Sequence, residues 1–191
     1  MALRYAILGY LSSGPGSGYD LVQQMDGDLG WFWAASHSQI YPELRNLEAA
    51  GLIEGTATTV GERLEKRVYS LTEEGARELQ AWTEKAPQYR PNRDAERLQL
   101  IFADDNGVEA IRAHLETHLE HFTRRRAQLI GMRDRILNRE HPRVEQRLAS
   151  KGPQGRELSL YLRDIAYGGD LRRAEGEIAW AQESLARLDE L

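Results

Sequence analysis

The sequence contains no cysteine, which excludes disulfide bonds and metal sites built on thiolates. No apolar run approaches the roughly 18 residues that a membrane span requires, and no basic segment precedes the apolar stretch at the start, so neither a membrane contact nor a signal peptide is predicted. These absences predict a cytoplasmic protein. At 191 residues the chain is long enough for one large or two small folded domains.

Enzyme motifs are also missing. The sequence has no phosphate-binding glycine loop, no nucleophile elbow and no HExxH zinc motif. Its adjacent carboxylates, Asp104-Asp105 and Asp189-Glu190, fall at expected helix ends or near the terminus, where helix capping and solvation explain them. We therefore predict that the protein is not an enzyme, and no cofactor is predicted.

Positive charge is scarce in the first part of the chain. Residues 1–85 hold seven Lys and Arg against twelve Asp and Glu, a net charge of −5, whereas the rest of the chain balances at 18 of each sign. Domains that bind nucleic acid are usually basic. Any DNA contact in this region must therefore use a local patch, with little non-specific affinity.

The stretch 36–52 has the pattern of an amphipathic helix. Ser36 and Gln39 are spaced as a capping box, and Gly51 follows the last good helix formers. One face is apolar at i, i+4 and i+7, through Ile40, Leu44 and Leu47. The other face carries side chains able to contact nucleic acid: Ser38, Gln39, Tyr41, Pro42, Arg45 and Asn46. Beyond a first turn Pro42 removes a helical hydrogen bond, so either the helix begins at Ser38 or its first turn is irregular.

Short helices and a hairpin surround this stretch. Helices are expected from about Leu3 to Leu11 and from Tyr19 to Leu29, the latter capped by Ser17. Residues 52–71 are expected to form a β-hairpin, and Thr72 caps a further helix. This order predicts a winged helix-turn-helix, in which the third helix enters a major groove and wing cations meet phosphates. The wing cations are Arg63, Lys66 and Arg67.

A stretch with two prolines at about 87–94 is expected to be a linker, which divides the chain into domains at 1–86 and 95–191. Beyond it the pattern is helical, with helices at about 97–102, 107–138 and 156–191. The predicted apolar seam of the last helix consists of Leu158, Leu162, Ile165, Leu171, Ile178, Leu185 and Leu188. Two long helices cannot enclose a core, because each buries only one stripe. A second copy of the chain completes it most simply, so a homodimer is expected.

The sequence resembles the PadR-like transcriptional regulators. The resemblance is dense over the first 85 residues and looser in the helical second half. It rests on these segments: Ile7-Leu8-Gly9-Tyr10-Leu11, Gly18-Tyr19-Asp20-Leu21, Ser38-Gln39-Ile40-Tyr41-Pro42-Glu43-Leu44, Leu47-Glu48-Ala49-Ala50-Gly51-Leu52-Ile53, Arg67-Val68-Tyr69-Ser70-Leu71-Thr72-Glu73-Glu74-Gly75 and Trp180. The wing departs from the family pattern by carrying Glu62 and Glu65 among its cations.

The resemblance implies a mainly α fold with a small β-hairpin wing, in which an N-terminal winged helix-turn-helix is followed by a C-terminal helical dimerisation domain. It implies a homodimeric, ligand-responsive repressor, and family members often respond to phenolic acids or drug-like aromatic compounds. The family's third helix and wing contact DNA, which would fall on Ser38, Gln39, Tyr41, Pro42, Arg45, Lys66 and Arg67. The alternative is a winged-helix interaction module that does not bind DNA, which the acidic first half favours.

Several residues have two interpretations. Tyr19 could help to grip a phosphate at a helix start, or could simply pack beside Gly18. Aromatic side chains that could bind an effector are Trp31, Trp33, Tyr89, Phe102 and Phe122. His114, His118 and His121 share a helical face, so they could hold a metal or sense pH, although a polar stripe is the more ordinary explanation. The run 124–126 of three arginines is expected to form a salt-bridged surface.

Overall fold

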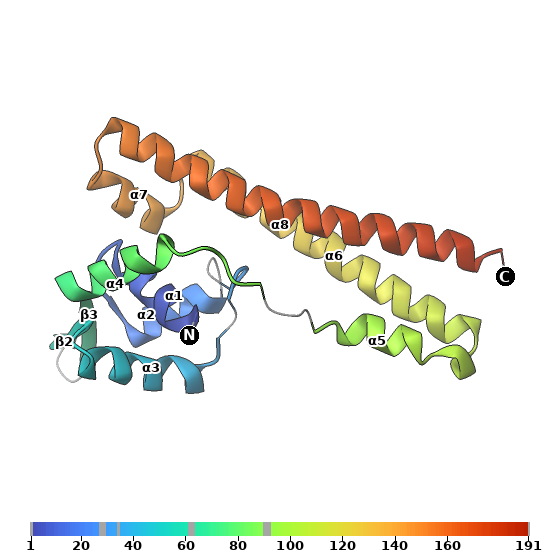
Figure 1. Ribbon diagram of the computed structural model, residues 1–191, viewed down its shortest axis with the longest axis horizontal. Helices are drawn as coiled ribbons and strands as arrows, with labels where there is room; N and C mark the ends of the chain where they lie inside the picture. The colour runs from blue at the N-terminus through green and yellow to red at the C-terminus, as the bar shows by residue number, and fades with distance from the viewer. Residues whose placement is uncertain (1, 27–29, 34, 61–63, 90–92, 191) are drawn as a thin grey trace. The chain divides into compact units, whose positions relative to one another are not determined.

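The computed structural model describes residues 2–26, 30–33, 35–60, 64–89 and 93–190. Its contacts divide the chain into two compact units. The first unit is Met1–Pro87 together with Pro142–Ser150, and the second is Gln88–His141 together with Lys151–Leu191 (Figure 1). Over the described residues, no helix is both long and apolar enough to span a lipid bilayer.

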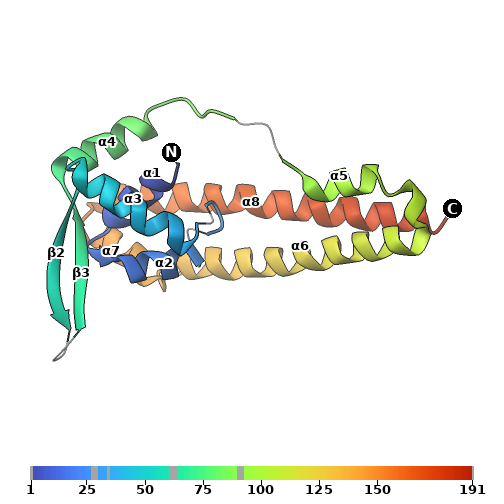
Figure 2. The same ribbon diagram turned by 90° about the horizontal axis from the view of Figure 1, so that it is seen from below.

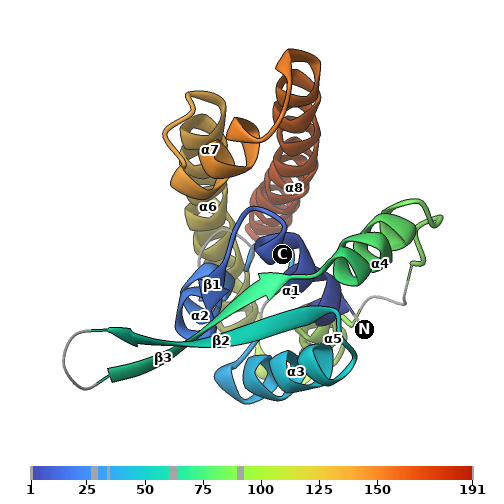
Figure 3. The same cartoon turned by 90° about the vertical axis from the view of Figure 1, so that its left-hand side faces the viewer.

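The first unit is a winged helix. Its elements are α1 (Ala2–Leu11), β1 (Gly16–Ser17), α2 (Gly18–Asp26), α3 (His37–Ala49), β2 (Ile53–Val60), β3 (Leu64–Leu71), α4 (Glu73–Thr83) and α7 (Pro142–Ala149). The strands form an antiparallel sheet in the order β1-β3-β2, with Ile53 opposite Leu71 and Gly16 opposite Tyr69 (Figure 3). The predicted hairpin is confirmed, and we call β2 and β3 the wing. The two-residue strand β1 was not predicted, because so short a segment carries no periodic pattern.

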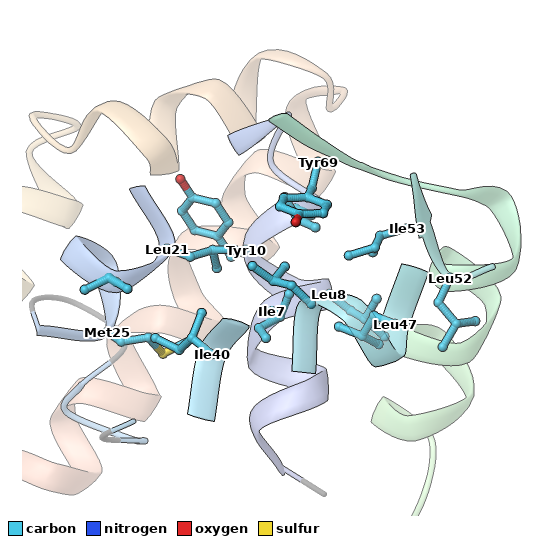
Figure 4. Close-up of a cluster of buried hydrophobic side chains, with 13 residues drawn as sticks. Ile7, Leu8, Tyr10, Leu21, Met25, Ile40, Leu47, Leu52, Ile53 and Tyr69 are labelled. Carbon is cyan, nitrogen blue, oxygen red and sulfur yellow. The ribbon is translucent and has the colours of Figure 1, made fainter. Parts of the chain in front are cut away.

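The core of this unit lies between α1, α2, α3 and the sheet (Figure 4). Ile40, Leu44 and Leu47 have no exposed surface, which confirms the predicted apolar face of α3. They pack in one cluster with side chains from the other elements: Ile7, Leu8, Leu11, Leu21, Val22, Met25, Leu52, Ile53 and Tyr69. Complete burial of one such side chain contributes about 1.5–3 kcal/mol. This packing fixes which face of α3 remains exposed.

Both ends of α3 follow local rules. The Gln39 Oε1 accepts the Ser36 backbone N–H at 3.0 Å, as the predicted capping box requires. At the other end Gly51 has a φ of +70°, and the N–H groups of Gly51 and Leu52 donate to the carbonyls of Glu48 and Leu47 at 2.9 and 3.0 Å. These two bonds form a Schellman motif.

Pro42 lies inside α3, which begins at His37 and not at Ser38. The proline cannot donate to the carbonyl of Ser38, four residues earlier. Both residues are exposed, so water can bond to that carbonyl. The exposure of this turn lowers the cost of the hydrogen bond that the proline removes.

Helix α7 belongs to the first unit although it follows the long helix of the second. This corrects the expected domain 95–191, since residues 142–150 pack with the N-terminal elements. Arg143 lies 3.9 Å from the centre of the Tyr10 ring and donates to the carbonyls of Gly14 and Pro15, each at 3.2 Å. Leu148 is fully buried, and Arg147 donates to the hydroxyl of Ser12. The His141-Pro142 break hid this helix from sequence reasoning, because Pro142 begins α7 and does not only interrupt a helix.

The second unit contains α5 (Ala95–Ile101), the short 3-10 helix η1 (Asp104–Asn106), α6 (Val108–Leu137) and α8 (Pro153–Leu188). Helices α6 and α8 run side by side (Figure 2). The buried residues of α8 are Ser159, Tyr167, Ala174, Ala181 and Leu188. Of the predicted seam, Leu188 is buried, whereas Leu158, Leu162 and Ile165 are 50–56% exposed in the single chain. Small side chains let α6 approach closely, and a row of large apolar side chains faces outward.

The packing of the first unit can be tested at Gly75, which lies in the first turn of α4. A Cβ at this position would lie 2.0 Å from the Leu52 carbonyl oxygen, whereas a Cβ at Gly9 in α1 would meet nothing within 4 Å. We expect Gly75→Ala to lower the free energy of unfolding by about 1–3 kcal/mol. The control Gly9→Ala should raise it by about 0.5–1 kcal/mol, because alanine favours helix. Urea unfolding followed by circular dichroism measures both, and equal effects of the two substitutions would contradict the described packing.

Candidate nucleic-acid interface

The polar face of α3 consists of side chains that are all exposed: Ser38, Gln39, Tyr41, Pro42, Arg45 and Asn46. The burial of the opposite face orients them outward. Gln39 also helps to cap the helix, because its Oε1 accepts the Ser36 N–H. Its amide nitrogen is the group that can still donate to a base or phosphate.

The start of α2 adjoins this face. A Cβ on Gly18 would lie 2.6 Å from Cε1 of Tyr41, so only glycine allows α2 to begin this close to the ring. Tyr19 is 59% exposed, and its hydroxyl accepts a hydrogen bond from Gln23 Nε2 at 2.9 Å. An exposed hydroxyl at a helix start can also meet a phosphate.

Lys66, on strand β3, lies beside the start of α2. Its Nζ lies 3.1 Å from Oδ2 of Asp20 in α2. The Asp20 carboxylate also accepts the Ser17 N–H at 2.9 Å and the Ser17 hydroxyl at 2.8 Å. The Ser17 hydroxyl oxygen accepts the Asp20 N–H at 3.3 Å, which confirms Ser17 as the cap of α2. Partial burial favours the neutral acid, but the bonds from Ser17 and Lys66 outweigh it and hold the pKa of Asp20 below its ordinary value.

The neighbouring cation, Arg67, is tied to α3. Its Nη2 lies 2.5 Å from Oε1 of Glu48, and the same oxygen accepts the Gly55 N–H at 2.9 Å. The bond to Glu48 raises the pKa of Arg67. Arg67 also lies 5.9 Å from the centre of the Tyr69 ring. One carboxylate therefore joins α3 to both strands of the wing.

Arg45 differs from these two cations. It is exposed on α3, and within the described ranges no carboxylate forms an ion pair with it. Arg63 lies outside the described residues. The described part of the face thus offers one unpaired cation, Arg45, and two cations already paired with acidic side chains.

The predicted effector residues do not form one site within either unit. Trp31 and Trp33 belong to the first unit, and Tyr89, Phe102 and Phe122 to the second. Phe102 lines a hollow of about 580 Å³ with residues of α5 and α6, whereas Phe122 lines another of about 410 Å³ with Arg97, Arg125 and residues of α8. Tyr89 is 91% exposed.

The three histidines have different surroundings. His118 is buried, with Nε2 3.1 Å from Oε2 of Glu177 and its ring against Phe122 and Trp180. His121 packs on the edge of Phe122, and His114 lines the larger hollow. Among the described side chains, no three potential ligands are grouped as a metal site. The run 124–126 is salt-bridged as predicted, to Glu120, Asp170 and Glu175.

Sequence reasoning missed Asp20 and Glu48 as members of this interface. The spacing of Ser17 and Asp20 is visible in the sequence and suggests a helix cap. No local signal indicates that Asp20 meets Lys66, 46 residues away, or that Glu48 meets Arg67, 19 residues away.

Comparisons with protein families match both parts of the chain. Residues 7–81 match the Transcriptional regulator PadR-like family, and residues 92–189 match the family described as Virulence activator alpha C-term. The Negative transcriptional regulator PadR of Bacillus subtilis is 50% identical over 80 residues, which are 42% of this chain and 44% of that protein. The chain spans about half the length of the curated relatives it matches.

Solved structures extend the likeness over nearly the whole chain. The crystal structure of B. subtilis PadR in complex with operator DNA has a TM-score of 0.78 at 29% identity and covers 98% of both chains. PadR of the same organism in complex with p-coumaric acid has a TM-score of 0.69 at 27% identity and covers 98% of this chain and 95% of that one. The winged-helix fold is therefore shared.

Asp20 should make stability depend on pH. Its pKa is lowered on folding, so the stabilisation is present above the unfolded-state pKa of about 4 and is lost as the pH falls through that value towards the folded-state pKa. Asp20→Asn keeps an oxygen acceptor for the Ser17 N–H but has no such titration. We expect wild type to lose more stability between pH 7 and pH 3 than Asp20→Asn, as measured by urea unfolding. Identical losses would contradict the assigned interaction.

Proposed function

The chain belongs to the PadR-like family of transcriptional regulators, and on this premise we propose that it binds double-stranded DNA and represses transcription. One observation carries the proposal. Helix α3 buries its entire apolar face and exposes a polar face, beside which Lys66 and Arg67 lie on the wing. A helix with these exposed groups fits the major groove, which is about 12 Å wide. A protein with this function would work where the DNA lies, in the cytoplasm.

The assigned residues divide by their chemistry. Arg45 and Asn46 have donors for base edges, and Arg45 can form the paired bonds that favour guanine. We propose that the phosphate backbone is contacted by Tyr19, Ser38, Tyr41, Lys66 and Arg67, together with Arg63, which lies between the two wing strands in the sequence. Gln39 and Pro42 shape the first turns of α3, where Gln39 caps the helix. Phosphate contacts set position and base contacts set sequence preference.

We propose that two chains associate through the second unit. Leu158, Tyr161, Leu162 and Ile165 form an outward row on α8 and are 50–59% exposed. Large apolar side chains that are exposed together on one helix face are typical of interaction surfaces. A two-fold symmetric pair would present two α3 helices to successive major grooves, about 34 Å apart, on a palindromic operator.

The repressor is proposed to respond to an aromatic effector. The relative from B. subtilis is a negative regulator, and PadR of that organism has been seen both with operator DNA and with p-coumaric acid. Trp31, Trp33, Tyr89, Phe102 and Phe122 are the candidate contacts. Release of DNA requires that the effector bind the non-DNA-competent state more tightly, since equal affinity shifts nothing.

A second candidate function is a winged-helix interaction module that does not bind DNA. The acidic balance of residues 1–85 favours it, together with the pairing of Lys66 and Arg67 to carboxylates. DNA binding by the purified chain distinguishes the two candidates.

The assigned face can be tested by fluorescence anisotropy with DNA from upstream of the chain's own gene. Arg45→Ala should raise the Kd about 5- to 150-fold, because one lost base contact costs about 1–3 kcal/mol. Adding Lys66→Ala should abolish binding. The control Arg77→Ala removes a cation from α4, which lies on another side of the unit from α3 (Figure 1). Unchanged binding by the double variant would refute the assignment.

The proposed association can be tested by light scattering after size exclusion. Leu162→Glu places a charge in the outward apolar row of α8, so we expect the mass to fall from two chains to one at micromolar concentration. Glu157→Gln, on the same helix, should leave it unchanged. A dimer that withstands Leu162→Glu would show that this row is not the interface.

A further inference from the structure

Two carboxylates stand where the DNA backbone is expected to lie. Asp20 belongs to the first turn of α2, and its oxygens accept from Ser17 and from Lys66. Backbone N–H groups at a helix start, with a lysine beside them, form a common phosphate site. Here the carboxylate of Asp20 already accepts one such N–H, that of Ser17, and is paired with Lys66.

Glu48 has the same relation to the second wing cation. Its Oε1 is 2.5 Å from Arg67 Nη2 and accepts the Gly55 N–H. Both ion pairs are partly open to solvent, with side-chain exposures of 37% and 38% for Lys66 and Asp20 and of 52% and 28% for Arg67 and Glu48. An incoming phosphate can therefore reach each cation and compete for it.

We propose that Asp20 and Glu48 are built-in competitors of the DNA backbone, each holding a wing cation in an ion pair that a phosphate must displace. This inference rests on the proposed function and adds a determinant of its affinity and specificity. Each competing carboxylate lowers the affinity for DNA of any sequence. At a matching DNA sequence the contacts of α3 with the bases hold the wing against the DNA backbone. Each wing cation can then favourably exchange its carboxylate partner for a phosphate.

The consequence is a wide gap between specific and non-specific binding. Non-specific affinity comes almost entirely from cations that meet phosphates. On the described part of the face, only Arg45 meets DNA without giving up a carboxylate partner. The acidic character of residues 1–85, which argued against DNA binding, then becomes a means of suppressing attachment to unrelated sequences.

The experiment compares wild type with Asp20→Asn by fluorescence anisotropy, on a 30-base-pair duplex of mixed sequence and on DNA from upstream of the gene. Asparagine keeps an oxygen for the Ser17 N–H and removes the charge facing Lys66. We expect Asp20→Asn to bind the mixed duplex about three- to tenfold more tightly. The dependence of log K on log salt should steepen by about 0.9, for one more phosphate neutralised. Glu48→Gln should act in the same direction.

Two controls separate competition from a general charge effect. Glu73→Gln removes one negative charge from the fully open surface of α4, where its side chain is 95% exposed, and should leave DNA affinity unchanged. In a Lys66→Gln background, Asp20→Asn should no longer tighten binding, because the cation for which it competes is absent. A similar gain from Glu73→Gln, or a gain that persists without Lys66, would overturn the proposal.

The other possible results distinguish failure of this inference from failure of the proposed function. If wild type binds DNA and Asp20→Asn binds equally or more weakly, Asp20 serves to position Lys66, and this inference fails while the proposed function stands. If neither wild type nor any variant binds either duplex, both fail. Tighter binding that depends on Lys66 supports both.

Discussion

The contact between the apolar face of α3 and the core beneath it determines most of what the first unit can do. Ile40, Leu44 and Leu47 are fully withdrawn from solvent. A helix has a single rotation that buries all three, so this packing also decides which side chains remain exposed. The polar residues contribute little to that choice. The candidate DNA surface is therefore held in place mainly by apolar burial, with a smaller contribution from the caps at either end of the helix.

Around α3, neighbouring elements are held at short range by specific contacts. The ring of Tyr41 lies against Gly18, where a Cβ would force it to move, and Glu48 joins α3 to both strands of the wing. Arg143 of α7 bonds to the turn that leads into β1 and α2. Because α7 is continuous in the chain with α6 and α8, the second half of the sequence contributes directly to the packing of the first unit.

The ion pairs near α3 affect recognition of DNA more than they affect the stability of the fold. Exposed ion pairs contribute little to stability, typically about 1 kcal/mol or less. Their consequence is in recognition, since a cation that already has a carboxylate gains less from a phosphate. A face whose described part has one unpaired and two paired cations can still bind DNA, provided that the contacts of α3 supply the additional free energy.

The sequence by itself determined those features that depend on residues only a few positions apart. The Ser36 capping box, the Gly51 helix end, the apolar face of α3 and the hairpin that follows it were all predicted correctly, since each follows from helical or strand periodicity. Only the tertiary structure decided the docking of α7, the pairing of Lys66 with Asp20 and the buried seam of α8. These depend on partners tens of residues away, or on how closely two helices approach. In α8 leucine was the obvious candidate for burial, yet Ala174 and Ala181 are more deeply buried than any leucine of this helix, because small side chains let α6 and α8 approach closely at these positions.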